Sequence, residues 1–163
     1  MIPLVAVAAA LAAALRLAVP VIPQTPDHCG PAALAMVLSF YGADSAAIAG
    51  AGRAYQPVLR GALITDLAEC ARRAGFPAEV ATLTPDSLES LLRAGVPPVI
   101  YFRRGLGPLT RGHYAVVVGF DPGSRRYLLN DGGARTVTCD AAVLVRRWRA
   151  SGSQALVVRR AAP

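Results

Sequence analysis

Cys29 is the one cysteine of the chain that the sequence places at the start of a helix. The segment from Cys29 to Phe40 has apolar residues at helical spacing, and Pro31 lies in its first turn, where a missing N–H group does no harm. The N–H groups and the dipole at a helix N-terminus favour a thiolate. Cys70 is predicted within a helix and Cys139 at a strand end, where that field is absent. Cys29 is therefore the candidate nucleophile.

A cysteine nucleophile needs a base close in space, and the chain has only two histidines that could serve. His28 directly precedes Cys29, so its side chain should point away from the thiol. His113 begins a predicted strand after Gly112, at the rim of a sheet, where it can face a helix N-terminus. The residues therefore favour His113 as the base.

A third polar group must orient such a base. The next predicted strand ends in Asn130 and Asp131, and a hairpin would bring both near the imidazole of His113. Successive side chains on a strand point to opposite faces, so only one of the two can hold the ring, and the residue types leave both open. Gln24 lies five residues before Cys29, where its amide and the Cys29 backbone N–H can form an oxyanion hole.

The elements that must position these residues come in a simple order, with helices first and most strands later. Helices are predicted over residues 29–40, 65–74, 85–93 and 141–149, with a short one after Asp44 or Ser45, and strands over 78–83, 98–102, 113–120, 127–130, 135–138 and 154–159. This order predicts an α+β fold in which an N-terminal helical part carrying the nucleophile packs on a C-terminal antiparallel sheet. A helix that begins with Cys, followed by a sheet that carries His and an Asn or Asp, is the papain-type chain order.

Composition excludes several other classes of protein. The chain has 163 residues, of which 54% are hydrophobic and 17% charged, so it can bury one core and is not a disordered protein. Its net charge of +7 comes entirely from scattered arginines with no binding motif, so we expect no nucleic-acid partner. The three cysteines match no zinc spacing, so we expect no metal, and at most two of them can pair.

The N-terminus has a different composition from the rest of the chain. Residues 2–15 are apolar and uncharged, a run too short for a membrane span of ~20 residues but typical of a signal-peptide core, and Ala12 to Ala14 have the small-x-small form of a cleavage site. We expect residues 1–18 to be a signal peptide or hydrophobic segment and residues 19–163 to be the folded domain. The alternative is a buried N-terminal helix. If this segment is a signal, we expect an exported protein that is periplasmic, extracellular or attached to the membrane through the segment. After cleavage of the signal, membrane association should be weak or absent. If the segment is not a signal, we expect a cytoplasmic protein.

Three stretches of the chain resemble one known family. The run QTPDHCGPAALAMVLSFYG, from Gln24, resembles the first motif of the bacteriocin-processing cysteine peptidases, papain-like enzymes that cut leader peptides after a double glycine. GHYAVVVGFD, from Gly112, resembles their His motif. LLNDG, ending at Gly132, resembles their Asp motif, which usually continues with Pro instead of Gly. The resemblance covers about residues 19–135 and implies a papain-like α+β fold.

Residue by residue, the resemblance makes Gln24 the oxyanion donor, Cys29 the nucleophile, His113 the base and Asp131 the orienting acid. It implies a thiol peptidase that needs no cofactor and acts on a peptide or protein, either a peptide leader or a cell-envelope peptide. A separate exporter is a second candidate partner. Two alternatives use the same fold: a catalytically silent peptide-docking domain, and an acyltransferase. A docking domain has no need of all four residues, so the peptidase is favoured.

Overall fold

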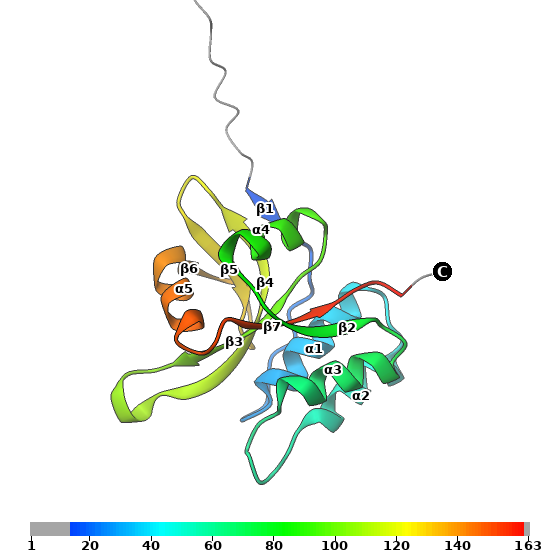
Figure 1. The fold of residues 1–163 in the computed structure, drawn as a ribbon. Coiled ribbons are helices and arrows are strands. Elements are labelled where there is room, and N and C mark those ends of the chain that lie inside the picture. Colours follow the sequence, from blue (N-terminus) through cyan, green and yellow to red (C-terminus); the bar gives the residue numbers. More distant parts are fainter. Residues whose placement is uncertain (1–13, 162–163) are drawn as a thin grey trace, which may run out of the picture.

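An antiparallel sheet is the centre of the protein, whose computed structural model describes residues 14–161. Its strands are β1 (Leu15–Arg16), β2 (Ala78–Thr82), β3 (Val99–Arg104), β4 (Arg111–Asp121), β5 (Arg126–Asn130), β6 (Val137–Asp140) and β7 (Gln154–Val158). Their spatial order is β2-β7-β3-β4-β5-β6, and β1 adds to β4. The C-terminal strand β7 therefore lies inside the sheet, between β2 and β3 (Figure 1).

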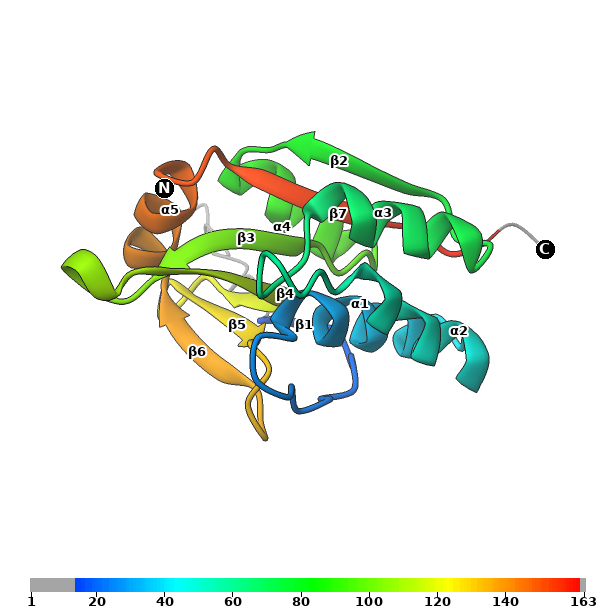
Figure 2. The same ribbon diagram turned by 90° about the horizontal axis from the view of Figure 1, so that it is seen from below.

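Helices cover both faces of this sheet. The α-helices are α1 (Cys29–Phe40), α2 (Ser45–Gly50), α3 (Ile64–Arg73), α4 (Pro85–Arg93) and α5 (Ala141–Arg149), and the 3-10 turns are η1 (Ala51–Ala54) and η2 (Gly107–Leu109). Figures 1 and 2 show α1, α2 and α3 grouped together, away from α4 and α5. The buried side chains form two clusters accordingly, one under α1 and α3 and the other under α4 and α5.

Strand β4 separates the two clusters. Tyr114, Val116 and Val118 pack into the cluster under α1 and α3, whereas Ala115 and Val117 pack into the cluster under α4 and α5. Alternate side chains of a strand point to opposite faces, so a strand covered on both sides is apolar throughout. This explains the valine-rich run after His113.

The predicted α+β class is confirmed, and α2, α4 and α5 begin directly after side chains that cap them. Asp44 accepts a hydrogen bond from the Ala47 N–H at 2.7 Å, Thr84 from Ser87 at 3.2 Å, and Asp140 from Val143 at 3.1 Å. Each predicted strand differs from the observed one by one or two residues at one or both ends, and β4 begins at Arg111 and not at His113. Strand β6 covers 137–140 and not 135–138, and β3 continues past 102 to Arg104 because it pairs with β4 as far as Arg111.

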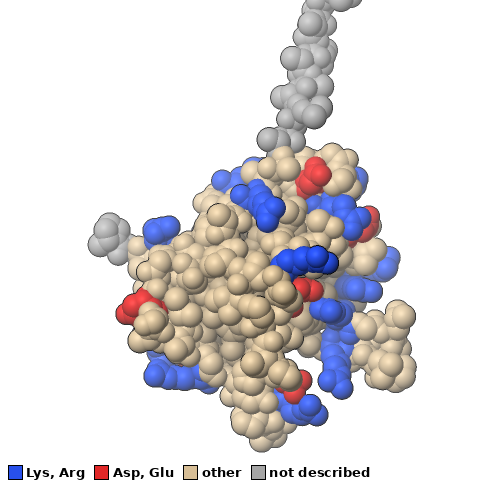
Figure 3. All heavy atoms as spheres, turned by 180° about the vertical axis from the view of Figure 1, so that it is seen from behind, with Lys and Arg blue, Asp and Glu red and all other residues tan. Residues whose placement is uncertain are grey.

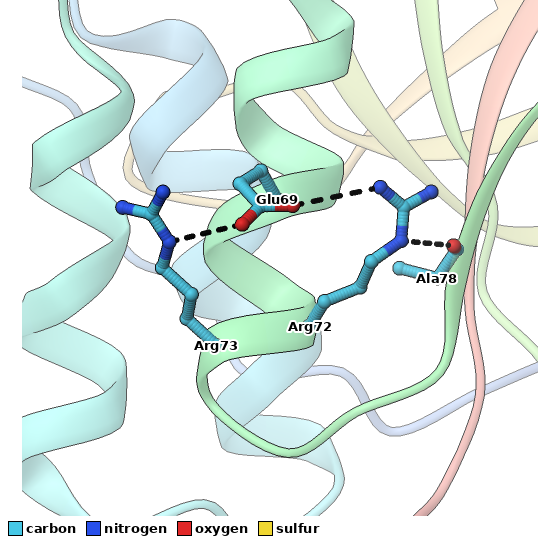
Figure 4. Close-up of polar contacts among 4 residues, drawn as sticks. All are labelled: Glu69, Arg72, Arg73 and Ala78. Carbon is cyan, nitrogen blue, oxygen red and sulfur yellow. Dashed lines mark hydrogen bonds and ion pairs between the residues drawn. The ribbon is translucent and has the colours of Figure 1, made fainter.

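The end of α3 is tied to the start of β2 (Figure 4). The Arg72 Nε donates to the Ala78 carbonyl oxygen at 3.0 Å, and its Nη1 lies 3.7 Å from a Glu69 oxygen. Arg73 binds the other Glu69 oxygen at 3.0 Å. Exposed ion pairs stabilise little, so the useful contact is the one to the Ala78 backbone, which links helix and sheet directly.

The fold begins before residue 19, the expected start of the domain. Leu15 pairs with Phe120 and Arg16 with Gly119, and the Leu17 N–H donates to the Val118 carbonyl at 2.7 Å. The end of the proposed signal segment is thus part of the sheet, while residues 1–13 lie outside the described residues. Within residues 14–161, no helix is both long and apolar enough to cross a membrane.

Arginines are spread over the surface. Figure 3 shows them at several separate places on the rear face, with acidic residues between them. Several form ion pairs within one helix, such as Arg93 with Glu89 at 3.0 Å on α4. The scatter seen in the sequence therefore persists in three dimensions on this face.

Candidate active site

Gln24, Cys29 and His113 line one cavity of about 810 Å³. The cavity lies where the N-terminus of α1 meets the β3–β4 hairpin, and the loop at residues 59–63 forms part of its wall. Three of the four residues predicted to act together are therefore brought to one place. Asp131 does not line the cavity but accepts a hydrogen bond from Arg104, which does.

Close packing at Gly30 brings the nucleophile helix against β4. A Cβ at Gly30 would lie 3.1 Å from Tyr114 Cδ2 and 3.1 Å from Ala62 Cβ, closer than most side chains tolerate. The Tyr114 hydroxyl donates to the Ala62 carbonyl at 3.0 Å and so holds the neighbouring loop as well. Cys29 thereby comes to lie beside the strand residue that follows His113.

His28 is turned away from the cavity, as its position next to Cys29 predicted. Its Nδ1 lies 2.7 Å from the Pro26 carbonyl oxygen, and its ring stacks on Tyr55 with centroids 4.0 Å apart. These contacts hold the ring outside the cavity lining. His113 remains as the histidine that faces the Cys29 cavity.

His113 is buried, with only 7% of its surface exposed. It lies opposite Phe102 on β3, and the two rings meet edge to face with centroids 5.6 Å apart. Burial lowers the pKa of His113 below its ordinary value of 6.5, and the nearby Arg104 charge lowers it further. The Asp131 carboxylate and a hydrogen bond with the Asp131 backbone raise the pKa in part.

Arg104 is a site residue that the sequence reasoning missed. Its Nη1 lies 3.4 Å from His113 Nε2 and 3.1 Å from Asp131 Oδ2. The structure shows no direct hydrogen bond between the His113 ring and the Asp131 carboxylate, because Arg104 contacts both. The alternation of side chains along a strand could have found it. If the strand predicted over 98–102 is extended by two residues, Arg104 lies on the same face as Phe102.

Asn130 and Asp131 point to opposite sides, as the alternation of a strand requires. Asn130 is fully buried; its Nδ2 donates to the Val19 carbonyl at 3.1 Å, and its Oδ1 accepts from Thr136 at 2.7 Å. Asp131 lies on the side of His113 and has 18% of its side chain exposed. Of the two residues left open by the sequence, only Asp131 is therefore placed near the imidazole.

Gln24 is held next to the segment that follows Asp131. Its backbone N–H donates to the Gly132 carbonyl at 2.9 Å, and its side chain lies where a Cβ of residue 132 would be. The Gln24 Oε1 is buried and has no hydrogen-bond partner among the described residues. The Nε2 group is then the part of the amide that is available to the cavity.

Both walls of the cavity carry apolar and charged side chains. Leu59 and Leu63 on one wall are 52% and 48% exposed, and Leu109 on the hairpin is 80% exposed. Asp27 and Arg60 form an ion pair at 3.0 Å on the helical side. Within residues 14–161, no three His, Cys, Asp or Glu side chains are grouped closely enough to hold a metal ion.

A cysteine at a helix N-terminus and a histidine in the first residues of a sheet strand, on an α+β fold, define a papain-like domain. The model described as the Peptidase C39 like family matches residues 16–156, and the chain belongs to this family. None of the curated proteins matches the chain.

Solved structures share the fold at low sequence identity. A double glycine motif protease from an AMS/PCAT transporter, in complex with a leader peptide, is 23% identical, with a TM-score of 0.70 over 89% of this chain and 94% of that one. The peptidase domain of the Streptococcus ABC transporter ComA is 22% identical, with a TM-score of 0.66 over 86% and 97%. A C39-like peptidase from Bacillus anthracis is 18% identical, with a TM-score of 0.75 over 93% and 100%.

Proposed function

We propose that the protein is a thiol-dependent peptidase that hydrolyses a peptide bond with Cys29, His113, Asp131 and Gln24. The observation that carries this proposal is that Cys29, at the N-terminus of α1, lines the same cavity as His113 of β4 and Gln24. The three come from separate segments of the chain, and a purely structural cysteine would need neither of the others. Family membership supports the same reaction class.

The roles follow from where the groups lie. The Cys29 thiolate attacks the carbonyl carbon of the scissile bond, and the oxyanion accepts hydrogen bonds from Gln24 and the Cys29 backbone N–H. The C–N bond then breaks as protonated His113 gives its proton to the leaving amine. His113 next takes a proton from water, whose oxygen attacks the thioester and releases the acid and Cys29. Asp131 orients the imidazole.

A peptide containing apolar residues is the substrate class that best fits the cavity. Exposed leucines on both walls offer apolar contact on either side of Cys29. One structural relative is a double glycine motif protease crystallised with its leader peptide, which supports a peptide leader as substrate and an exporter as partner. The apolar N-terminal run further supports an exported protein.

The contact of Arg104 with His113 Nε2 favours a second candidate, the catalytically silent peptide-binding domain. If this contact is permanent, Asp131 never orients the base. The two candidates differ in a direct way, because only the peptidase produces new peptide termini, whereas both bind peptides.

The test is to incubate the protein with a complex mixture of peptides and to identify new termini by mass spectrometry. We expect termini with a shared sequence around the cut, which disappear in Cys29→Ala and His113→Ala. Cys70→Ala is the matched control, because Cys70 lies on α3 away from the cavity, and it should retain cleavage. Cleavage by Cys29→Ala at the wild-type rate would rule out the proposed peptidase. So would a wild-type protein that binds peptides but cleaves none of them.

A further inference from the structure

Arg104 contacts Nε2 of His113, the ring nitrogen that should be hydrogen bonded to the orienting carboxylate. Its Nη1 lies 3.4 Å from Nε2 of His113. A guanidinium only donates hydrogen bonds and keeps its protons, so this contact uses the lone pair of Nε2. If Arg104 donates to Nε2 in this arrangement, a neutral His113 carries its proton on Nδ1.

That proton position is the opposite of the one a base needs. Arg104 lies at Nε2 and also donates to Asp131 Oδ2, so we assign Nδ1 as the nitrogen for the Cys29 thiol. To accept a proton from the thiol, Nδ1 needs a free lone pair, so the ring proton must be on Nε2, donated to Asp131. Arg104 therefore has to move before the triad can form.

A second feature indicates what could move it. Arg104 and Arg111 are directly opposite each other on β3 and β4, on the face that also carries His113, and both line the cavity. Like charges opposite each other are destabilising. Arg111 makes no ion pair with any residue that the structure describes, and the Arg104 side chain is 56% exposed. An anion between the two guanidinium groups would relieve their repulsion.

We propose that Arg104 and Arg111 form a carboxylate subsite, and that an acidic group of the bound peptide draws Arg104 away from His113 and Asp131. Asp131 then accepts the Nε2 proton and the Cys29–His113 pair becomes competent. Arg104 is thus a positioning residue, and it selects peptides that carry a carboxylate close to the cut. The inference rests on the proposed peptidase function for its biological meaning.

Other charged groups around His113 do not compete for this role. The cavity also holds the Asp27–Arg60 pair on the opposite wall, where each charge already has its partner at 3.0 Å. The Cys29 thiol is the remaining ionisable group facing the cavity from α1, and Tyr101 and Tyr114 complete it from the sheet. Arg104 is the one cation hydrogen bonded to His113 in the described part of the chain.

The first test measures the tautomer and pKa of His113 by long-range ¹H–¹⁵N NMR. The chain has only two histidines, and a His28→Gln variant assigns the signals. We expect the Nδ1–H tautomer in the neutral wild type, and the Nε2–H tautomer with a raised pKa of His113 in Arg104→Gln. Arg103→Gln is the matched control, since Arg103 neighbours Arg104 but does not line the cavity. A wild type already in the Nε2–H form, or an unchanged tautomer in Arg104→Gln, overturns the positioning role.

The second test compares the alkylation rates of Cys29 with iodoacetate and iodoacetamide at low ionic strength. With each reagent the Cys29 sulfur forms a bond to the CH₂ carbon as iodide leaves into solvent, and the two reagents differ in carrying a carboxylate or a neutral amide. The ratio of their rates should fall about threefold in Arg104→Gln and in Arg111→Gln, as expected for one charge removed about 6 Å away in water. Arg103→Gln should keep the wild-type ratio. A ratio that is the same in all four proteins overturns the subsite.

The two tests do not depend on peptide cleavage, so the failures can be told apart. If no peptide is cleaved but the tautomer and the ratio respond to Arg104→Gln, the proposed function is wrong and the subsite stands. If peptides are cleaved through Cys29 and neither readout responds, only the role of Arg104 is wrong.

Discussion

The side chain of Gln24 occupies the space where a Cβ of residue 132 would be, directly against Gly132. Gly132 has a φ of 85°, in the left-handed region that favours glycine, and its carbonyl accepts the Gln24 N–H at 2.9 Å. The loop before the nucleophile helix is thereby fixed to the residue after Asp131. The departure from the usual Pro at this position has a physical reason here, since Pro could not adopt this φ.

Replacing Gln24 by Ala should slow acylation by ~10²- to 10³-fold, the usual effect of removing one oxyanion donor. The thermal melt should change little, because the side chain makes no hydrogen bond within the described part of the chain through its buried Oε1. Single-turnover kinetics give the acylation rate, and Gln154→Ala on β7 is the control. A Gln24→Ala rate within a factor of two of wild type would show that the amide is not the oxyanion donor.

Gly132→Ala should also lower turnover, because the new methyl group would displace Gln24. The positive φ adds a strain of ~1–2 kcal/mol. Gly152→Ala separates the two effects: Gly152 has a φ of 89°, and its nearest neighbour to an added Cβ is 3.9 Å away. We expect both variants to lose stability in a denaturant titration and only Gly132→Ala to lose activity. Equal activities in the two variants would contradict the displacement of Gln24.

Asp131 and Asn130 should differ in what their loss affects. Asp131→Ala should lower turnover strongly while the fold persists, because Asp131 is partly exposed and bonds to Arg104. Asn130→Ala should lower the free energy of unfolding by ~1–3 kcal/mol, since it leaves the buried Val19 carbonyl and the Thr136 hydroxyl without their partner. Denaturant curves and turnover per folded molecule distinguish the two. The reverse pattern would assign the orienting role to Asn130.

Shortening the N-terminus should separate the segment before β1 from the fold. A protein that starts at Leu15 keeps the pairing of β1 with β4 and should melt like one that starts at Met1. A start at Val19 removes this pairing and the Leu17 hydrogen bond, so it should melt several degrees lower. Circular dichroism melts of the three proteins provide the measurement. Equal melting of the two shortened proteins would mean that β1 contributes nothing.

The free energy of unfolding should fall as the pH is lowered from about 7 to 5. Burial and Arg104 lower the pKa of folded His113, so the unfolded chain, whose histidine titrates near 6.5, takes up the proton first. One such group gives a slope of at most about 1.4 kcal/mol per pH unit, and the associated stability is present above 6.5 and lost below it. Urea titrations of wild type and His113→Gln isolate this contribution. Parallel pH profiles would contradict the lowered pKa.

Local sequence signals predicted most of the helices and the position of the nucleophile Cys29. Asp44, Thr84 and Asp140 cap their helices through hydrogen bonds three residues along the chain, which any sequence reading can anticipate. The position of Cys29 at the first residue of α1 has the same local origin. The turn-forming sequence Asp-Pro-Gly-Ser at residues 121–124 likewise predicted the β4–β5 hairpin, because its residues are adjacent in the chain.

The contacts of the site were decided by pairings between distant segments. Strand β7 lies between β2 and β3, and nothing local to residues 154–158 distinguishes an inner strand from an edge one. Arg104 reaches His113 because β3 stays paired with β4 as far as Arg111, an outcome of register and not of the residues near Arg104. The alternation of β5 limited the orienting group to one of two residues. Only the hydrogen bond from the Asn130 amide to the distant Val19 carbonyl assigned Asn130 to the other side and left Asp131 on the side of the base. Periodicity along a strand comes from the backbone itself, whereas the partner across the sheet depends on which distant side chains fill the core around it.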